Sequence, residues 1–257
     1  MNWHRLTTPL LAAGMTLAAL SWFPRALTAA PVEFGSSRHQ TSLLELYTSE
    51  GCSSCPPAET WLSKLKDNTG LWRDFVPVAF HVDYWNYLGW RDPWSQEAAS
   101  DRQREYARQW GSANIYTPEL VLNGAEWQRP VWSHSLPKTG LKDAGELKAS
   151  SADGWQWQVT YSAPAGSPRV YELHSALLVS GVGSDVTAGE NAGRHLSHDF
   201  VALIHNEQPL VGKTNDFRGS FRIDPSLKPT TGRLALAVWV VPNGQAQPAQ
   251  AVGGWLP

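Results

Sequence analysis

The chain has 257 residues, 42% of them apolar, so it is long and apolar enough for one large domain or two ordinary ones. Its formal net charge of −2 and the lack of a basic stripe argue against nucleic-acid binding. After the first thirty residues no run of about twenty apolar residues occurs, which argues against a membrane span in the mature protein.

The first thirty residues have the pattern of a secretory signal peptide. Arg5 supplies a positive charge, residues 10–20 form an apolar core, and residues 28–30 are small, as a cleavage site requires. We therefore expect cleavage after Ala30 and a periplasmic or secreted mature protein. Removal of residues 1–30 takes away two arginines and no acids, which leaves 19 basic and 23 acidic residues and a net charge of −4. An uncleaved anchor is the alternative, because the apolar run continues beyond residue 20.

The only two cysteines, Cys52 and Cys55, are spaced C-x-x-C between a predicted strand at 43–48 and a predicted helix at 56–66. The first turn of a helix leaves backbone N–H groups unpaired and carries partial positive charge, so it stabilises a thiolate. The pattern therefore predicts a redox site. We expect Cys52 to be the more exposed, attacking sulfur and Cys55 to resolve the mixed disulfide.

A second interpretation of the cysteine pair stays open. The dipeptide between the cysteines, Ser53-Ser54, brings no positive charge, and Glu50 close by disfavours a thiolate. Export also places the protein in an oxidising compartment, where a cysteine pair persists as a disulfide without any catalytic role. The alternative to a redox-active pair is therefore a purely structural disulfide.

The first half of the chain alternates strands and helices. In chain order we expect a strand at 43–48, a helix at 56–66, a strand at 75–82, a helix at 96–110, a strand entered at Pro118, a hairpin at Asn123-Gly124 and a closing helix at 138–149. The first two strands should be parallel, and the third should run antiparallel beside the first. This order predicts an α/β thioredoxin-like domain over residues 31–149.

The pattern changes from about residue 150. Short alternating or apolar segments are separated by Gly, Pro and Asn turns, at 155–161, 170–179, 198–205, 219–223 and 233–241. Several short strands at such spacing predict an all-β antiparallel sandwich-like domain over residues 150–257.

Several distinctive segments closely resemble one family of secreted bacterial proteins, the domain of unknown function 1223. They are 46–58 with the C-x-x-C, 81–85, 88–93, 116–118 and 189–198. The resemblance spans nearly the whole mature chain. It implies a thioredoxin-like domain, and it implies no established substrate or activity.

The resemblance also implies roles for two residues far from the cysteines. In the wider thioredoxin superfamily, the proline that faces the C-x-x-C is cis, and the backbone beside it pairs with the substrate peptide. Pro118, preceded by Thr117, matches that place, which makes both residues candidates for substrate binding. No tryptophan directly precedes Cys52 and the intervening dipeptide is Ser-Ser, so the redox poise of better-known members does not carry over.

An aromatic segment at 83–94 follows the strand at 75–82, at the sheet edge where we expect Cys52. Tyr84, Trp85 and Trp90 are candidates for a substrate-binding wall over the cysteines, because aromatic side chains with polar tips bind peptides and small ligands. The alternative is ordinary packing of large aromatic side chains.

His81 and Asp83 stand at the end of the same strand and are, with Glu50, candidates for tuning Cys52. Together with the two sulfurs they also offer a soft site for copper(I) or zinc, as a lesser alternative. Farther along, residues 190–194 form a charged turn. It is either a ligand site or a structural turn in which Glu190 pairs with Arg194.

The sequence therefore predicts an exported thiol–disulfide oxidoreductase that needs no cofactor and acts on a thiol or disulfide of an exported partner protein. Cys52 and Cys55 would carry the reaction, and Thr117 and Pro118 would hold the partner. The rival prediction is a non-catalytic binding or adaptor protein with a structural disulfide and an aromatic groove.

Overall fold

The fold was analysed in a computed structural model, which describes residues 1, 31–128, 136 and 142–257. The predicted signal peptide, Met1 apart, lies outside the described residues. None of the helices in these ranges is long and apolar enough to cross a membrane.

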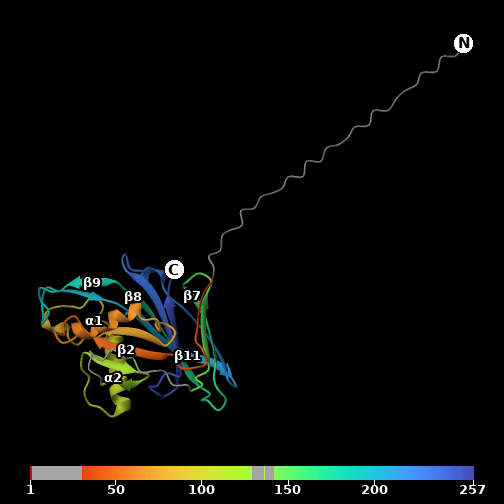
Figure 1. The fold of residues 1–257 in the computed structure, drawn as a ribbon, viewed down its shortest axis with the longest axis horizontal. Coiled ribbons are helices and arrows are strands. Elements are labelled where there is room, and N and C mark those ends of the chain that lie inside the picture. Colours follow the sequence, from red (N-terminus) through yellow and green to blue (C-terminus); the bar gives the residue numbers. More distant parts are fainter. Residues whose placement is uncertain (2–30, 129–135, 137–141) are drawn as a thin grey trace.

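One mixed sheet of twelve strands organises the described chain, together with a two-stranded sheet and two α-helices (Figure 1). The strands are β1 (Val32–Gly35), β2 (Ser42–Thr48), β3 (Phe75–His81), β4 (Glu119–Leu122), β5 (Ala125–Glu126), β6 (Glu146–Ser151), β7 (Gln156–Ser162), β8 (Tyr171–Ser180), β9 (Val182–Asp185), β10 (His195–His198), β11 (Val201–Lys213), β12 (Asp216–Arg222), β13 (Arg233–Pro242) and β14 (Gln250–Trp255). The helices are α1 (Pro56–Lys64) and α2 (Glu97–Trp110), and the 3-10 turns are η1 (Leu65–Asp67), η2 (Asn86–Leu88) and η3 (Pro225–Leu227).

The predicted α/β thioredoxin-like domain followed by an all-β antiparallel sandwich-like domain is wrong as a fold class. Strands from both halves of the chain pair in the same mixed sheet, whose order runs β1-β6-β7-β12-β11-β3-β2-β4-β5, with β8, β13 and β14 attached through β11. The chain is therefore mostly β, with a large sheet that crosses the boundary we predicted between the halves. Whether residues 31–149 and 150–257 fold independently stays a prediction.

The long strand β11 is the physical reason for this difference. At its start Val201 pairs in parallel with Ala79 of β3, and β8 pairs along most of its length. At its end, Val211 to Lys213 pair with β12. A single strand of 13 residues thus joins the strands of the first half to those of the second.

Several local pairings agree with the sequence pattern. Strand β2 is parallel to β3 and antiparallel to β4, and β4 and β5 form the hairpin. The helix predicted at 138–149 is wrong in its described part, because residues 146–149 belong to strand β6; residues 138–141 lie outside the described ones. There Leu147 and Ala149 are buried while Lys148 between them is exposed, which is the alternation of a strand with one face on a core.

Strand β13 shows how the layers are built. Its residues are buried on both faces, and alternate side chains enter two different cores: Leu236 and Val238 pack with β7 and β12, whereas Ala237 and Trp239 pack towards α2. Figure 1 shows α1 and α2 on opposite sides of β2, which likewise sends alternate side chains to two cores. The sheet is thus a middle layer with a separate apolar core on each face.

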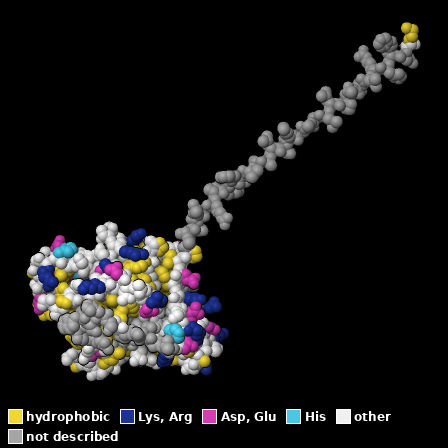
Figure 2. Space-filling view, in the orientation of Figure 1, with side chains coloured by type: hydrophobic (Ala, Val, Ile, Leu, Met, Phe, Trp, Pro, Cys, Tyr) yellow, Lys and Arg dark blue, Asp and Glu magenta, His cyan; other side chains and the backbone are white. Residues whose placement is uncertain are grey.

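Charged side chains are interspersed on the face drawn in Figure 2, where blue and magenta side chains do not separate into stripes. The expectation that the protein binds no nucleic acid stays a prediction.

Candidate functional site

The two cysteines form a disulfide directly at the start of α1, with their Cα atoms 5.5 Å apart. Cys55 is the N-cap residue of α1, and its carbonyl oxygen accepts hydrogen bonds from the backbone N–H groups of Ala58 and Glu59. Pro56 and Pro57 occupy the first two helical positions, where the missing N–H groups cost no intrahelical hydrogen bond. The helix start therefore lies where the sequence predicted it.

Both cysteines are buried, with exposed fractions of 1% for Cys52 and 0% for Cys55. In the disulfide form the two residues hardly differ in exposure, so our expectation that Cys52 is the more exposed, attacking sulfur stays a prediction. Ser53 and Ser54 between them are exposed, and Ser54 Oγ lies 3.3 Å from Cys52 Sγ. The disulfide is thus buried, and the dipeptide that links its two cysteines is exposed to solvent.

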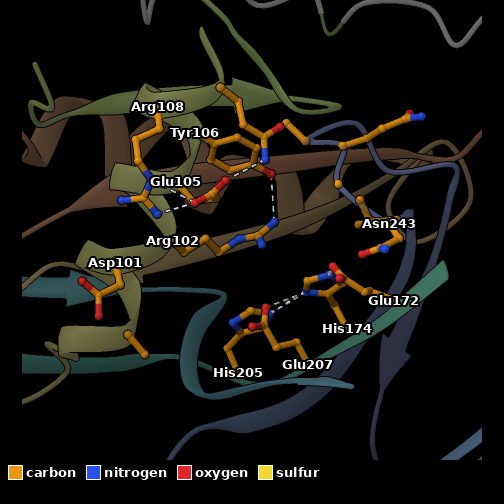
Figure 3. Close-up of a pocket in the computed structure, with 16 residues that line it drawn as sticks. Asp101, Arg102, Glu105, Tyr106, Arg108, Glu172, His174, His205, Glu207 and Asn243 are labelled. Carbon is orange, nitrogen blue, oxygen red and sulfur yellow. Dashed lines mark hydrogen bonds and ion pairs between the residues drawn. The ribbon is translucent and has the colours of Figure 1, made fainter. Parts of the chain in front are cut away.

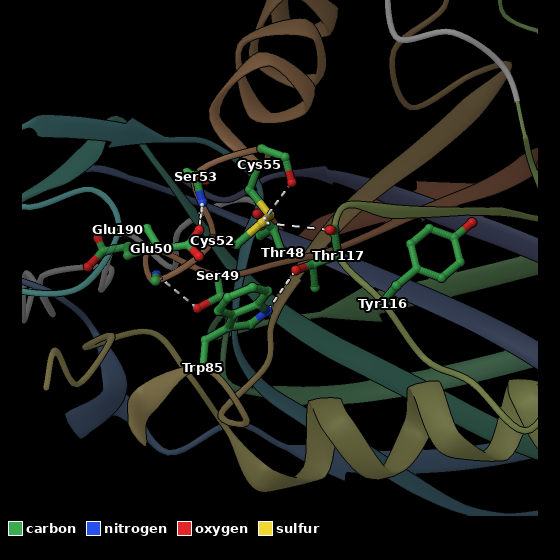
Figure 4. The surroundings of a disulfide bond; sticks show 12 residues. Thr48, Ser49, Glu50, Cys52, Ser53, Cys55, Trp85, Tyr116, Thr117 and Glu190 are labelled. Atoms are coloured by element: carbon green, nitrogen blue, oxygen red, sulfur yellow. Dashed lines mark hydrogen bonds between the residues drawn. A yellow bond between two sulfur atoms is a disulfide. The ribbon is translucent and has the colours of Figure 1, made fainter. Parts of the chain in front are cut away.

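Thr117 and Trp85 stand beside the disulfide, as predicted from two distant segments (Figure 4). The carbonyl oxygen of Thr117 is 3.7 Å from Cys52 Sγ, and the peptide bond between Thr117 and Pro118 is cis, as the resemblance implied. Trp85 Nε1–H donates a 2.8 Å hydrogen bond to Thr117 Oγ1. The polar tip of Trp85 is therefore used to position Thr117.

Glu50 is the centre of a buried polar network, which we call the His198 network: Glu50, Glu59, His81, Asp92 and His198. Glu50 Oε1 lies 2.8 Å from His198 Nε2, and Glu50 Oε2 accepts a 2.7 Å hydrogen bond from Trp90 Nε1. The Glu50 backbone N–H donates to Asp92 Oδ2 at 2.9 Å. All five network residues are buried. Glu50, two residues before Cys52, therefore belongs to a polar cluster that is shielded from water.

His198 is held between two carboxylates. Its Nδ1 is 2.5 Å from Glu59 Oε2, opposite the contact with Glu50, and Thr48 Oγ1 donates to the other oxygen of Glu59. Burial by itself would lower the pKa of His198, but the hydrogen bonds and charges of Glu50 and Glu59 outweigh it and raise the pKa to about 10. Burial would raise the pKa of Glu59, and His198 lowers it on balance. His198 is therefore a buried cation at neutral pH.

His81 makes the second histidine–carboxylate contact of the network. Its Nδ1 is 2.7 Å from Asp92 Oδ2, and its ring packs edge-on against His198 with centroids 4.9 Å apart. Burial would raise the pKa of Asp92, but the charge and hydrogen bond of His81 lower it on balance. Among the described residues, His81 Nε2 has no hydrogen-bond partner.

Metal binding at this place would use Glu59, His81 and His198, whose donor atoms lie within 4.8 Å of one another. Both ring nitrogens of His198 are already engaged by carboxylates, and a protonated imidazole has no lone pair for a metal. The cysteine sulfurs are joined in the disulfide and are not thiolate ligands in this form. The arrangement favours a proton-holding network over a metal site.

The turn at 190–194 lies against the cysteine loop. Asn191 Nδ2 donates hydrogen bonds of 2.9 Å to the carbonyl oxygens of both Glu50 and Cys52, and Glu190 Oε2 accepts one of 2.9 Å from the Ser53 N–H. The predicted Glu190–Arg194 pair is not formed, because Arg194 Nη1 donates to Asn191 Oδ1 instead. Residues 137 to 141 positions away in sequence therefore hold the C-x-x-C in place.

A protein-family model for a protein of unknown function, DUF1223, matches residues 43–241. The chain belongs to the DUF1223 family. Among solved structures, a crystal structure of a protein from Agrobacterium tumefaciens is similar, with a TM-score of 0.59 and 21% identity over 86% of this chain and 96% of that one. HBP35 of Porphyromonas gingivalis is similar with a TM-score of 0.58 and 13% identity, over 86% of this chain and 76% of that one. Among curated proteins, none matches. At such identities the two structures show a shared fold.

Two predicted residues of this DUF1223 chain face away from the cysteines. Asp83 Oδ1 accepts a 2.5 Å hydrogen bond from Ser100 Oγ on α2, so Asp92 rather than Asp83 pairs with His81. Tyr84 OH donates to Gln103 Oε1 at 3.1 Å, and burial raises the pKa of Tyr84 to about 12. Both side chains fasten the aromatic segment to α2.

Sequence reasoning missed Glu59, Asp92 and His198 as members of the site. Asp92 and His198 lie within the segments that resemble the family, which was the available signal. Glu59 looked like an ordinary first-turn acid of α1, where it favours the helix dipole. Its role appears only when β10 brings His198 against it.

Proposed function

We propose that this DUF1223 protein is an exported thiol–disulfide oxidoreductase whose reactive pair is Cys52 and Cys55. Two observations carry the proposal: the disulfide lies at the start of α1, and the backbone carbonyl of Thr117 stands 3.7 Å from Cys52 Sγ. The first is the place where a thiolate is stabilised. The second offers a backbone group beside the sulfur to which an extended partner segment can hydrogen-bond. The N-terminal pattern at residues 1–30 supports export.

The reaction is a transfer of a disulfide that consumes no other reagent. In the reduced protein, the Cys52 thiolate attacks a partner disulfide, one partner sulfur leaves as a thiolate, and a mixed disulfide forms. Cys55 then attacks Cys52 Sγ, the second partner sulfur leaves, and the Cys52–Cys55 disulfide forms again. The two protons of the protein thiols pass to the partner thiols, so the partner is reduced by two electrons and the protein is oxidised by two. The same steps in reverse oxidise a partner dithiol.

The His198 network supports this chemistry by fixing charge close to the pair. Glu50 precedes Cys52 by two residues, and Glu59 follows Cys55 by one helical turn. Because His198 keeps its proton between these carboxylates, its positive charge offsets theirs next to a developing thiolate. We propose His198 as a positioning residue that acts on the pair through Glu50 and Glu59.

One observation favours the second candidate, a binding protein with a structural disulfide: Cys52 is 1% exposed. Two of the aromatic tips are also engaged inside the molecule, since Trp85 bonds Thr117 and Trp90 bonds Glu50. In that case the pair would stay oxidised, and recognition would belong to other surfaces.

The reduction potential of the pair separates the two functions. Mature protein is equilibrated in glutathione buffers and its free thiols are trapped and counted. A potential near or above about −230 mV places the pair among exchange-active dithiols, whereas one below about −300 mV is typical of a structural disulfide and would overturn the proposal.

A trapping experiment supplies the matched control. Cys55→Ala leaves Cys52 without its resolving partner, so we expect it to accumulate mixed disulfides with exported proteins. Cys52→Ala leaves only Cys55, which in this proposal resolves the mixed disulfide and does not attack the partner, and it should accumulate none. Equal labelling of the two variants would contradict the assigned roles.

A further inference from the structure

A second group of histidines lies under α2, on the other face of the sheet (Figure 3). We call it the His174 cluster: His174, His205, Glu207 and Trp239. In the antiparallel register His174 of β8 stands opposite Trp239 of β13 on one side and Glu207 of β11 on the other. His205 precedes Glu207 by two residues, so the alternation of β11 puts it on the same face. Three neighbouring strands thus present these side chains together.

The ring nitrogens and the carboxylate converge. His174 Nδ1 is 3.1 Å from His205 Nε2 and 3.7 Å from Glu207 Oε2, and one donor atom from each residue lies within 4.8 Å of the others. Ligand atoms about 2.05 Å from a tetrahedral zinc ion lie about 3.4 Å apart. The two distances bracket that value, so small side-chain rotations bring the three atoms onto one ion. Both imidazoles stack parallel to Trp239, which limits their other movements.

A second observation points to the same ligand. The side chain of His174 is only 4% exposed, and its Nε2 has no hydrogen-bond partner among the described residues. The carboxylate of Glu172 stands 3.9 Å from this nitrogen. Histidines that bind metal through one nitrogen commonly donate the other N–H to a carboxylate, which fixes the ring. Glu172 is placed for that role when His174 binds through Nδ1.

The carboxylates of Glu172 and Glu207 lie 3.9 Å and 3.7 Å from the ring nitrogens of His174, and Arg102 lies over the Trp239 ring of the same cluster. The nearby arginines are already paired, Arg102 with Glu45 at 2.7 Å and Arg108 with Glu105, which leaves Glu172 and Glu207 facing the histidines. A neutral imidazole is the form that binds metal.

We propose that His174, His205 and Glu207 bind one divalent transition-metal ion, with zinc as the best-fitting member. Two imidazoles and one carboxylate are ligands that zinc accepts, and the adjoining cavity of about 580 Å³ leaves room for water at the remaining coordination position. The site shares no residue with the disulfide or with the His198 network. The metal-binding proposal is therefore independent of the redox proposal.

The test is calorimetric titration of zinc chloride into untagged mature protein that has been stripped with a chelator. The cysteines are kept oxidised, so that thiolates do not contribute. We expect one zinc ion per chain for the wild type. Glu207→Gln and His205→Gln should each weaken zinc binding by roughly tenfold or more, because loss of a direct ligand costs at least as much as loss of an outer-shell partner.

Two features keep the test decisive. Glu207 has an exposed side chain, at 68%, so its replacement by glutamine leaves the fold intact. The control is His195→Gln, which removes an exposed histidine that pairs with Asp185 at 2.7 Å elsewhere on the surface, and it should bind zinc like the wild type. The proposal is overturned if the wild type binds no zinc, or if Glu207→Gln and His205→Gln bind it as tightly as His195→Gln.

Discussion

The two histidine clusters of this protein lie on opposite faces of one strand and have opposite protonation states. In β3, Phe80 packs edge-on against His205, and the next residue, His81, packs edge-on against His198. His198 lies between two carboxylates, and its pKa is raised to about 10. His205 lies against Trp239 and under Arg102, and burial and that cation lower its pKa to about 3. His198 is buried and His205 is partly buried, and the difference in the direction of their pKa shifts follows from the charged partners around each ring.

This difference separates what each cluster can do. A histidine that keeps its proton holds positive charge beside the disulfide and cannot bind a metal. A histidine that stays neutral offers a lone pair and contributes little to long-range electrostatics. The same residue type thus lies in the proposed redox site on one face of the sheet and in the proposed metal site on the other.

The largest expected effect comes from removing the charged member. His198→Leu keeps roughly the side-chain volume but leaves Glu50 and Glu59 buried without their shared cation. We expect the free energy of unfolding at pH 7 to fall by about 3–5 kcal/mol, as is usual when one partner of a buried ion pair is lost. Urea denaturation measures this. The control His195→Leu, in an exposed pair, should change stability by about 0.5 kcal/mol or less; similar losses in both variants would show that His198 is not a buried cation.

The pH dependence of stability should show both clusters at once. The pKa of His198 rises from 6.5 to about 10 on folding, so its contribution is complete below pH 6.5 and is lost as the pH rises towards 10. At about 1.4 kcal/mol per pH unit, stability should drop by roughly 3 kcal/mol between pH 7 and 9. For His205 the pKa falls from 6.5 to about 3, so the unfolded chain binds a proton that the folded chain refuses, and stability drops as the pH falls below 6.5.

Two variants separate the limbs of this profile in urea denaturation at a series of pH values. His198→Leu should flatten the alkaline limb. His205→Gln should make the limb between pH 6.5 and 5 shallower, and the remainder comes from His174, whose pKa is also lowered by burial. If His198→Leu changed the acid limb, or His205→Gln changed the alkaline limb, the opposite protonation states of the two clusters would be contradicted.

The strand pattern predicted local structure well because local structure depends on neighbours in sequence. Apolar runs and the Asn123-Gly124 turn are enough to place β2, β3 and the β4–β5 hairpin. The joined sheet was not predictable in this way. The prediction ended a strand at His205, because the residues that follow are polar and include Pro209. In the structure Pro209 pairs with Glu172 of β8, and the strand continues to Lys213. Pairing with β8 outweighs the local turn preference.

The residues of the candidate site likewise divide into those predicted from local sequence and those brought together only by the fold. Cys52, Glu50 and His81 were predicted because they stand next to one motif or at the end of one strand. The partners that set their chemistry come from elsewhere: His198 meets Glu50 across 148 positions and Glu59 across 139. One sequence shows that such groups exist, and only the fold shows which of them meet.

A smaller effect is expected at the contact between the turn at 190–194 and the cysteine loop, next to the His198 network. Asn191→Ala removes the donor to the carbonyl oxygens of Glu50 and Cys52 and leaves both buried without it. We expect a loss of about 2 kcal/mol in the free energy of unfolding and faster reduction of the disulfide by dithiothreitol, because the loop is held less firmly. The exposed Asn114→Ala is the control. An unchanged reduction rate would show that this turn does not restrain the C-x-x-C.

The smallest effect is expected at the neutral histidine, and it completes the comparison with His198→Leu. In chelator-treated protein, His174→Leu removes one hydrogen bond, the 3.1 Å contact with His205, and also removes a buried nitrogen that has no partner among the described residues. These changes oppose each other, so we expect a loss of about 1 kcal/mol in urea denaturation and no change in the rate of disulfide reduction. A loss as large as that of His198→Leu would contradict the comparison, because the two histidines would then contribute equally to stability.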